Sequence, residues 1–133
     1  MTPCFADTFY FLALVNPKDE AHKLATAEAY TSRRPLVTTI WVLTEVADAL
    51  AVGGNRRLFG PLLDQLRSDP RLSIIREADD WFERGVDLYR QRLDKEWSLT
   101  DCISFVVMRE HDLTEALTAD HHFEQSGFVI LLK

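Results

Sequence analysis

The chain has 133 residues, of which 47% are hydrophobic, so it is long and apolar enough to form one globular domain with its own core. Fifteen basic and 21 acidic residues give a formal net charge of −6, which argues against a protein that holds nucleic acid mainly by bulk positive charge. No uncharged apolar stretch of about 18 residues occurs, so we expect no membrane span. We expect no signal peptide either, and a cytoplasmic location.

The first half of the chain alternates short apolar runs with longer helical patterns. The predicted elements are strand 3–6, helix 8–15, helix 18–32, strand 36–38, helix 39–52, helix 55–68 with a bend near Gly60-Pro61, and strand 72–75. Asn16-Pro17 and Gly53-Gly54 end two of these helices. In the helix before Gly53, Leu43, Val46 and Leu50 repeat at helical spacing, so one face is predicted to be buried.

The second half continues the same alternation. The predicted elements are helix 78–95, helix 98–111, strand 115–118, a short turn or helix 121–126, and strand 128–132. Between Cys102 and Met108 only Ser104 is polar, so this helix is expected in the middle of the fold. Strands that alternate with helices predict an α/β fold, with three α/β/α layers around a mostly parallel sheet.

Two cysteines occur, Cys4 and Cys102, and both lie among apolar residues. We predict buried free thiols, as is usual in a reducing cytoplasm. A disulfide between the two is the alternative, but a chain of this length does not need one.

Four acidic residues stand beside strongly apolar segments. Asp7 and Asp120 directly follow predicted strands, whereas Glu45 and Asp101 lie in the first turns of predicted helices. Ligands of open parallel sheets bind beyond the carboxyl ends of the strands, so these side chains are expected to converge at that edge. Carboxylates that close together repel by about 1–4 kcal/mol per pair at intermediate dielectric. A hard cation such as Mg²⁺ or Mn²⁺ would neutralise them.

Each acid also has a purely structural interpretation. Asp7 and Asp120 stand at N-cap positions, and the pattern from Ser98 to Asp101 fits a capping box. Glu45 fits the solvent face of its helix, opposite the apolar residues. A cap uses one carboxylate oxygen and leaves the other, so capping and metal binding are compatible.

Several of these segments together resemble a PIN domain, most closely the VapC-type toxin ribonucleases of bacterial toxin–antitoxin pairs. They are the run Ala6-Asp7-Thr8, the mid-helix Glu45, the segment LTDCISF at 99–105 and the segment TADHHFEQSGF at 118–128. The resemblance covers the chain as a single PIN-like domain, 1–133. It implies a parallel sheet with flanking helices, an acidic pocket that holds Mg²⁺ or Mn²⁺, and endonucleolytic cleavage of RNA.

The resemblance assigns roles to individual residues. The acidic site positions are Asp7, Glu45, Asp101 and Asp120, and the accompanying hydroxyl residues are Thr8 and Thr118. No acid is missing, which favours an active ribonuclease. The alternative is a non-catalytic PIN-like module that binds RNA or protein. We predict Asp7 and Asp101 as direct metal ligands. Glu45 and Asp120 are predicted to hold metal-bound waters, and either one is a candidate to take a proton from the attacking water.

Partners also follow from the resemblance, because toxins of this type usually form dimers and bind a small antitoxin protein. We therefore expect an RNA substrate, an antitoxin, a homodimer and a peptide-binding groove. An antitoxin would silence the enzyme by placing a basic side chain in the acidic pocket. The consecutive residues Phe9, Tyr10 and Phe11 cannot all be buried by one helix face, so at least one is available to a partner.

Two further groups of residues are open to a functional interpretation. Segment 55–76 has five arginines and two aspartates, which suits either phosphate contacts or a solvated helix surface. His121 and His122 are adjacent, so in a helical turn their side chains point about 100° apart, which is a poor fit for a zinc site. In the last motif, His122 stands at a position that varies in the family.

Overall fold

A computed structural model describes all 133 residues and contains one five-stranded sheet, in the order β3-β2-β1-β4-β5. The strands are β1 (Cys4–Ala6), β2 (Leu36–Thr39), β3 (Leu72–Ile75), β4 (Glu115–Leu117) and β5 (Val129–Ile130). Every neighbouring pair is parallel. The central strand β1 pairs with β4 so that Ala6 lies opposite Leu117, which brings the carboxyl ends of these two strands together.

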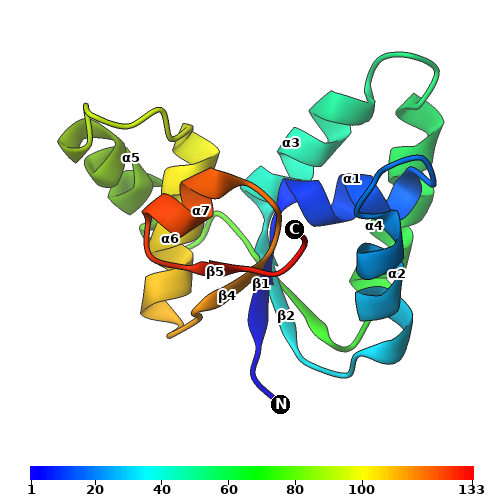
Figure 1. Cartoon of the computed structure of the whole chain (residues 1–133). Helices are drawn as coiled ribbons and strands as arrows, with labels where there is room; N and C mark the ends of the chain where they lie inside the picture. The colour runs from blue at the N-terminus through cyan, green and yellow to red at the C-terminus, as the bar shows by residue number, and fades with distance from the viewer.

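Helices cover both faces of the sheet and confirm the predicted three-layer α/β/α fold (Figure 1). They are α1 (Thr8–Val15), α2 (His22–Thr31), α3 (Ile40–Leu50), the 3₁₀ helix η1 (Arg56–Leu58), α4 (Phe59–Ser68), α5 (Trp81–Gln91), α6 (Leu99–Glu110) and α7 (His121–Gln125). Helices α5 and α6 lie on one side of the sheet, and α2 and α4 lie on the other (Figure 1). None of these helices is both long and apolar enough to cross a membrane.

Helix α2 begins four residues later than predicted. The side chain of Asn16 accepts a hydrogen bond from the backbone N–H of Lys18, and that of Asp19 accepts one from Ala21. These side chains give the backbone an alternative to helical hydrogen bonding, so residues 16–21 form turns and the helix starts at His22.

Other predicted boundaries also shift. Helix α5 is shorter than the predicted 78–95, because Asp79 has a left-handed backbone (φ 64°) and Arg92 pairs with Asp94 just beyond the helix. Segment 55–68 is a 3₁₀ helix followed by α4, so its break comes at Leu58 rather than near Gly60. The last strand has two residues instead of the predicted five.

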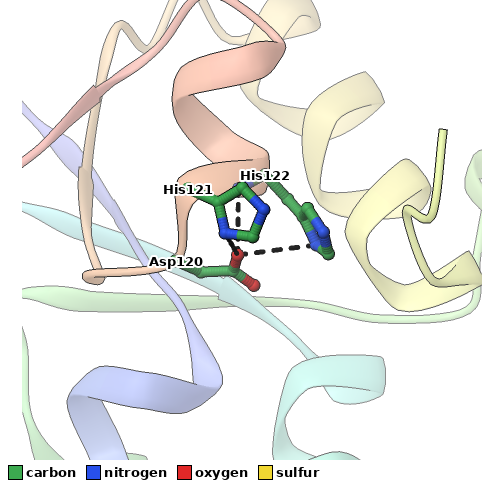
Figure 2. Close-up of side chains that lie close together, drawn as sticks. All are labelled: Asp120, His121 and His122. Atoms are coloured by element: carbon green, nitrogen blue, oxygen red, sulfur yellow. Dashed lines mark hydrogen bonds and ion pairs between the residues drawn. The ribbon is translucent and has the colours of Figure 1, made fainter.

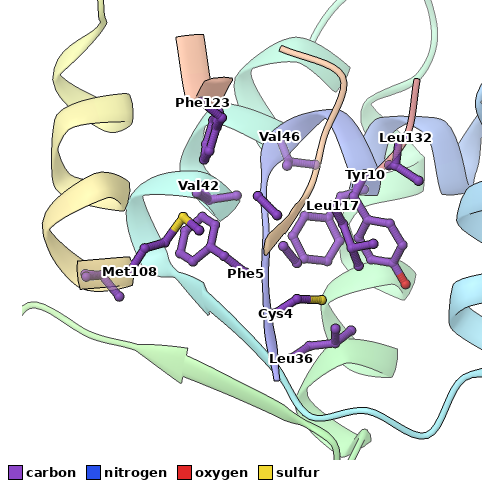
Figure 3. Close-up of a cluster of buried hydrophobic side chains, with 14 of the residues drawn as sticks. Cys4, Phe5, Tyr10, Leu36, Val42, Val46, Met108, Leu117, Phe123 and Leu132 are labelled. Atoms are coloured by element: carbon purple, nitrogen blue, oxygen red, sulfur yellow. The ribbon is translucent and has the colours of Figure 1, made fainter. Parts of the chain in front are cut away.

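The hydrophobic core fills the space between the sheet and the helices, where side chains of β1, β4, α1, α3 and α6 meet (Figure 3). Phe105 of α6 packs edge-on against both Trp97 and Phe123, with ring centroids 5.0 Å apart in each pair. Both cysteines are free and buried, as predicted, and burial raises the pKa of Cys4 to about 12 and that of Cys102 to about 11. Both thiols are therefore inert at neutral pH.

A close approach of α5 to α6 fixes the position of α6. A Cβ atom at Gly85 would lie 2.3 Å from Cγ1 of Ile103 and 3.1 Å from its Cα, so no other residue fits there without a shift. Ile103 is two residues from Asp101, which makes this contact part of the framework that holds the acidic edge of the sheet.

One arginine of the basic segment 55–76 has a clear role within the fold. The Arg71 guanidinium donates hydrogen bonds to the carbonyl oxygens of Ser32 (2.6 Å) and Ala29 (3.2 Å), at the end of α2. It thereby satisfies carbonyl groups that a helix end leaves without partners. The other four arginines of this segment are exposed: Arg56, Arg57, Arg67 and Arg76.

Candidate active site

The four predicted acids converge at the carboxyl end of the sheet. Asp7 follows β1, Asp120 follows β4, and Asp101 lies in the first turn of α6. Glu45 is the sixth residue of α3, which begins at Ile40, so it lies in the second turn of the helix rather than in the first. All four line one pocket of about 370 Å³.

Asp7 is the most deeply buried of the acids, with 4% of its surface exposed. Its Oδ2 accepts a hydrogen bond of 2.9 Å from the Thr118 hydroxyl, whereas its Oδ1 is buried without a hydrogen-bond partner. The side chain does not cap α1, so the capping interpretation is wrong for this residue. Burial raises the pKa of Asp7 to about 7, with a further rise from the charges of Asp101 and Glu45.

Glu45 faces the pocket rather than bulk solvent, which overturns its purely structural interpretation. Its Oε1 accepts a hydrogen bond from the hydroxyl of Thr8, the first residue of α1. Burial raises the pKa of Glu45, and the charges of Asp101 and Asp120 raise it further. Thr8 and Thr118 therefore each hold one acid of the pocket, in line with their predicted place beside the first and last acids.

Asp101 and Asp120 do cap helices, and both also line the pocket. Asp101 completes the predicted capping box: its backbone N–H donates to Oγ of Ser98 (3.0 Å), and its Oδ2 accepts from the Ser98 N–H (3.2 Å). Asp120 caps α7 by accepting from the N–H of His122 at 2.9 Å. Burial raises the pKa of Asp101, and the charge of Asp120 adds to the rise.

A histidine that the sequence analysis did not assign to the site also lines this pocket. Nδ1 of His122 lies 3.3 Å from Oδ2 of Asp101 and 3.5 Å from Oδ1 of Asp120. Figure 2 shows the rings of His121 and His122 at the start of α7, both beside the Asp120 carboxylate. The sequence signal for His122 is its position two residues after Asp120, the acid that follows β4. Glu96 is a second pocket residue that the sequence analysis missed.

The donor set fits a hard divalent cation. A buried carboxylate oxygen without a partner is costly unless a positive charge or a donor satisfies it, and Oδ1 of Asp7 is such an atom. Carboxylate oxygens are ligands that Mg²⁺ and Mn²⁺ favour. The most compact set of donor atoms, all within 4.8 Å of one another, belongs to Asp120, His121 and His122, so the predicted ligands are not the closest-spaced group.

Known proteins resemble the chain in sequence and in structure, although no protein-family model matches it. The chain is 31% identical over 130 residues to the 23S rRNA-specific endonuclease VapC20 of Mycobacterium tuberculosis. The alignment covers 94% of this chain and 95% of VapC20. The crystal structure of VapC20, described as a sarcin–ricin loop cleaving toxin, superimposes with a TM-score of 0.84 at 25% identity. That alignment covers 95% of this chain and 96% of VapC20.

Two more distant structures share the fold. VapBC2 from Rickettsia felis, bound to a DNA fragment from their promoter, aligns with a TM-score of 0.69 at 13% identity over 98% of both chains. FitAcB from Neisseria gonorrhoeae aligns with a TM-score of 0.68 at 15% identity over 96% of both chains. At these identities the likeness concerns the fold alone. The identity to VapC20 over nearly the whole of both chains goes further: this chain belongs to the PIN-domain family of VapC-type toxin ribonucleases.

Proposed function

We propose that the protein is a metal-dependent endoribonuclease that hydrolyses RNA phosphodiester bonds with Mg²⁺ or Mn²⁺. The observation that carries the proposal is the buried Oδ1 of Asp7, which has no hydrogen-bond partner inside a pocket lined by three further acids. An oxygen in that position is suited to a cation. In this proposal Asp7 and Asp101 hold the ion directly, and Glu45 and Asp120 orient water around it.

The bound cation supplies a Lewis acid beside the scissile phosphate. The acids of the chain supply the proton chemistry. A base works best when its pKa lies near the working pH, and burial moves the pKa of Glu45 in that direction. Thr8 fixes the orientation of Glu45 through its hydroxyl hydrogen bond. Glu45 is therefore the stronger candidate to accept the proton of the attacking water, and Asp120 is the second candidate.

For the substrate we propose 23S rRNA, because VapC20 is a 23S rRNA-specific endonuclease and matches nearly the whole chain. The test is incubation of the purified protein with bacterial ribosomes in Mg²⁺, followed by primer extension along the 23S rRNA. We expect one dominant cut in the sarcin–ricin loop and no cut when the cation is chelated. Intact 23S rRNA after prolonged incubation would rule out this substrate and favour a non-catalytic module.

For the partners we propose an antitoxin protein and a second copy of the chain, since the fold is shared with VapBC2. A surface suited to an apolar peptide segment is the cavity of about 290 Å³ between α1, α2 and α4. Tyr30 lines it and is 80% exposed. Co-expression with the neighbouring open reading frame tests this. A tight complex that Tyr30→Asp weakens, with RNA cleavage by the free protein unchanged, is the expected result.

A further inference from the structure

His122 is held in the acidic pocket by two kinds of contact. Its backbone N–H donates to Oδ1 of Asp120, and its ring nitrogen Nδ1 faces Oδ2 of Asp101 and Oδ1 of Asp120. The helix that carries it is anchored by the buried ring of Phe123 and by a 2.9 Å hydrogen bond from Trp97 to Gln125. The packing of α7 therefore fixes the backbone at His122, and from there the imidazole faces the two carboxylates.

The neighbouring histidine differs in each of these respects. The His121 side chain is 70% exposed, whereas that of His122 is 21% exposed. His121 reaches only Asp120, with Nδ1 at 3.7 Å from Oδ1, and does not line the pocket that the four acids share. Of the two adjacent imidazoles, only His122 directs a nitrogen to two of the pocket carboxylates.

Nδ1 of His122 lies close enough to a pocket carboxylate for the two groups to bind one ion. Adjacent ligands of an octahedral ion with bonds of about 2.1 Å lie about 3.0 Å apart. The distances from Nδ1 of His122 to the oxygens of Asp101 and Asp120 are 3.3 and 3.5 Å, which is near that spacing. Imidazole nitrogen is a ligand that transition-metal ions accept readily, whereas Mg²⁺ favours oxygen.

We infer that His122 supplies a nitrogen ligand to the divalent cation of the acidic pocket, and that the pocket therefore prefers Mn²⁺ to Mg²⁺. This inference rests on the proposed metal-dependent function and adds a nitrogen ligand to Asp7 and Asp101, the two acids proposed to hold the ion directly. A role limited to hydrogen bonding, in which His122 only orients Asp101 and Asp120, would place no nitrogen on the metal. The two roles differ in a spectroscopic signature.

The experiment uses the full chain, freed of metal with a chelator and then loaded with MnCl₂. Pulsed electron paramagnetic resonance detects ¹⁴N coupled to bound Mn²⁺, and calorimetry gives the affinities for Mn²⁺ and Mg²⁺. The variant is His122→Asn, which keeps an oxygen donor at similar reach. The matched control is His121→Asn. We expect ¹⁴N coupling in the wild type and in His121→Asn and none in His122→Asn, whose Mn²⁺ affinity falls by about tenfold or more. The Mg²⁺ affinity falls less.

Absence of ¹⁴N coupling in the Mn²⁺-loaded wild type would overturn the inference, as would coupling that persists in His122→Asn or is lost in His121→Asn. If His122→Asn does not fold, ¹⁵N-histidine labelling of His121→Asn decides the question, since the nitrogen coupling must change isotope. RNA cleavage measured in parallel separates the two proposals. Metal-dependent cleavage without nitrogen coupling removes only this inference, whereas failure to bind any Mn²⁺ removes both this inference and the metal dependence.

Discussion

The hydroxyl of Thr118 donates a 2.9 Å hydrogen bond to Oδ2 of Asp7, across 111 positions of sequence. The same hydroxyl oxygen accepts a hydrogen bond from the N–H of Asp120 at 3.1 Å. Thr118 is fully buried, so it links the acids that follow β1 and β4 without access to water. Thr118 therefore connects the carboxyl ends of β1 and β4, and both of these strand ends border the pocket.

Replacement of Thr118 with valine tests this link. Valine has nearly the same shape but neither donates to Asp7 nor accepts from Asp120, so buried polar groups lose their partners. We expect the free energy of unfolding to fall by about 1–3 kcal/mol and RNA cleavage to fall by about tenfold to 100-fold. Urea unfolding and single-turnover cleavage measure the two effects. Thr44→Val, at an exposed threonine of α3, is the control and should change neither appreciably. Equal effects at the two positions would disprove the special role of Thr118.

The pH dependence of stability tests the burial of Asp7. Its pKa is raised from 3.8 to about 7, so the folded state keeps this proton to a higher pH than the unfolded state does. The stabilisation from the protonated form is thus complete below about pH 4 and is lost as the pH rises to about 7, at a slope of up to about 1.4 kcal/mol per pH unit. Asp7→Asn cannot ionise and lacks this slope. In the presence of a chelator, the free energy of unfolding of Asp7→Asn should exceed that of the wild type at pH 8. At pH 5 the two values should lie closer together. Parallel stability curves from urea unfolding would refute this.

The capping box of α6 gives a third prediction. Ser98→Ala removes the hydroxyl that accepts from the N–H of Asp101. Loss of an N-cap costs about 1 kcal/mol, and it loosens the first turn of α6, which carries Asp101, although the Ser98 N–H still donates to the Asp101 carboxylate. We expect a lower melting temperature together with weaker Mn²⁺ binding. Ser98→Thr keeps a hydroxyl acceptor at the cap without adding a charge to the pocket, so it should keep most of the melting temperature. A variant with alanine that melts and binds Mn²⁺ like the wild type would show that the cap does not support the site.

The contact between α5 and α6 gives a fourth prediction. In Gly85→Ala the new methyl group would collide with Ile103, so we expect a loss of about 1–3 kcal/mol in the free energy of unfolding. Gly60 of α4 has nothing within 4 Å of an added Cβ, which makes Gly60→Ala the matched control. The control should be neutral or more stable, because alanine favours helix over glycine. A gain of stability in both variants would mean that helix propensity, not the contact with Ile103, governs position 85.

Much of this fold is predictable from the sequence, because the patterns that indicate its strands, helices and caps involve neighbouring residues. The strand-end positions of Asp7 and Asp120 follow from alternating strands and helices, and the spacing of Ser98 and Asp101 is visible as a capping box. The place of Glu45 near the other acids was predicted from its position early in the helix that follows β2, although a solvent-facing position was equally consistent with helical periodicity. These predictions needed only neighbouring residues and the known direction of parallel strands.

The remaining features depend on contacts between distant parts of the chain. Oδ1 of Asp7 is buried without a hydrogen-bond partner because β1 packs between β2 and β4. No pattern of neighbouring residues in the sequence predicts this. The placement of His122 depends on how α7 docks beside α6, and the role of Arg71 depends on the end of α2. From the sequence, Gly85 is only a residue of low helix propensity, and its role in packing follows from its distance to Ile103.

The central claim is that the gathered carboxylates hold a cation that RNA cleavage requires. The most direct measurement is the single-turnover rate of RNA cleavage in Mg²⁺ for the wild type, Asp7→Asn and Asp101→Asn, with the exposed Asp64→Asn of α4 as control. We expect both pocket variants to lose at least about 100-fold in rate, and the control to match the wild type. Rates near that of the wild type in both pocket variants would contradict the account.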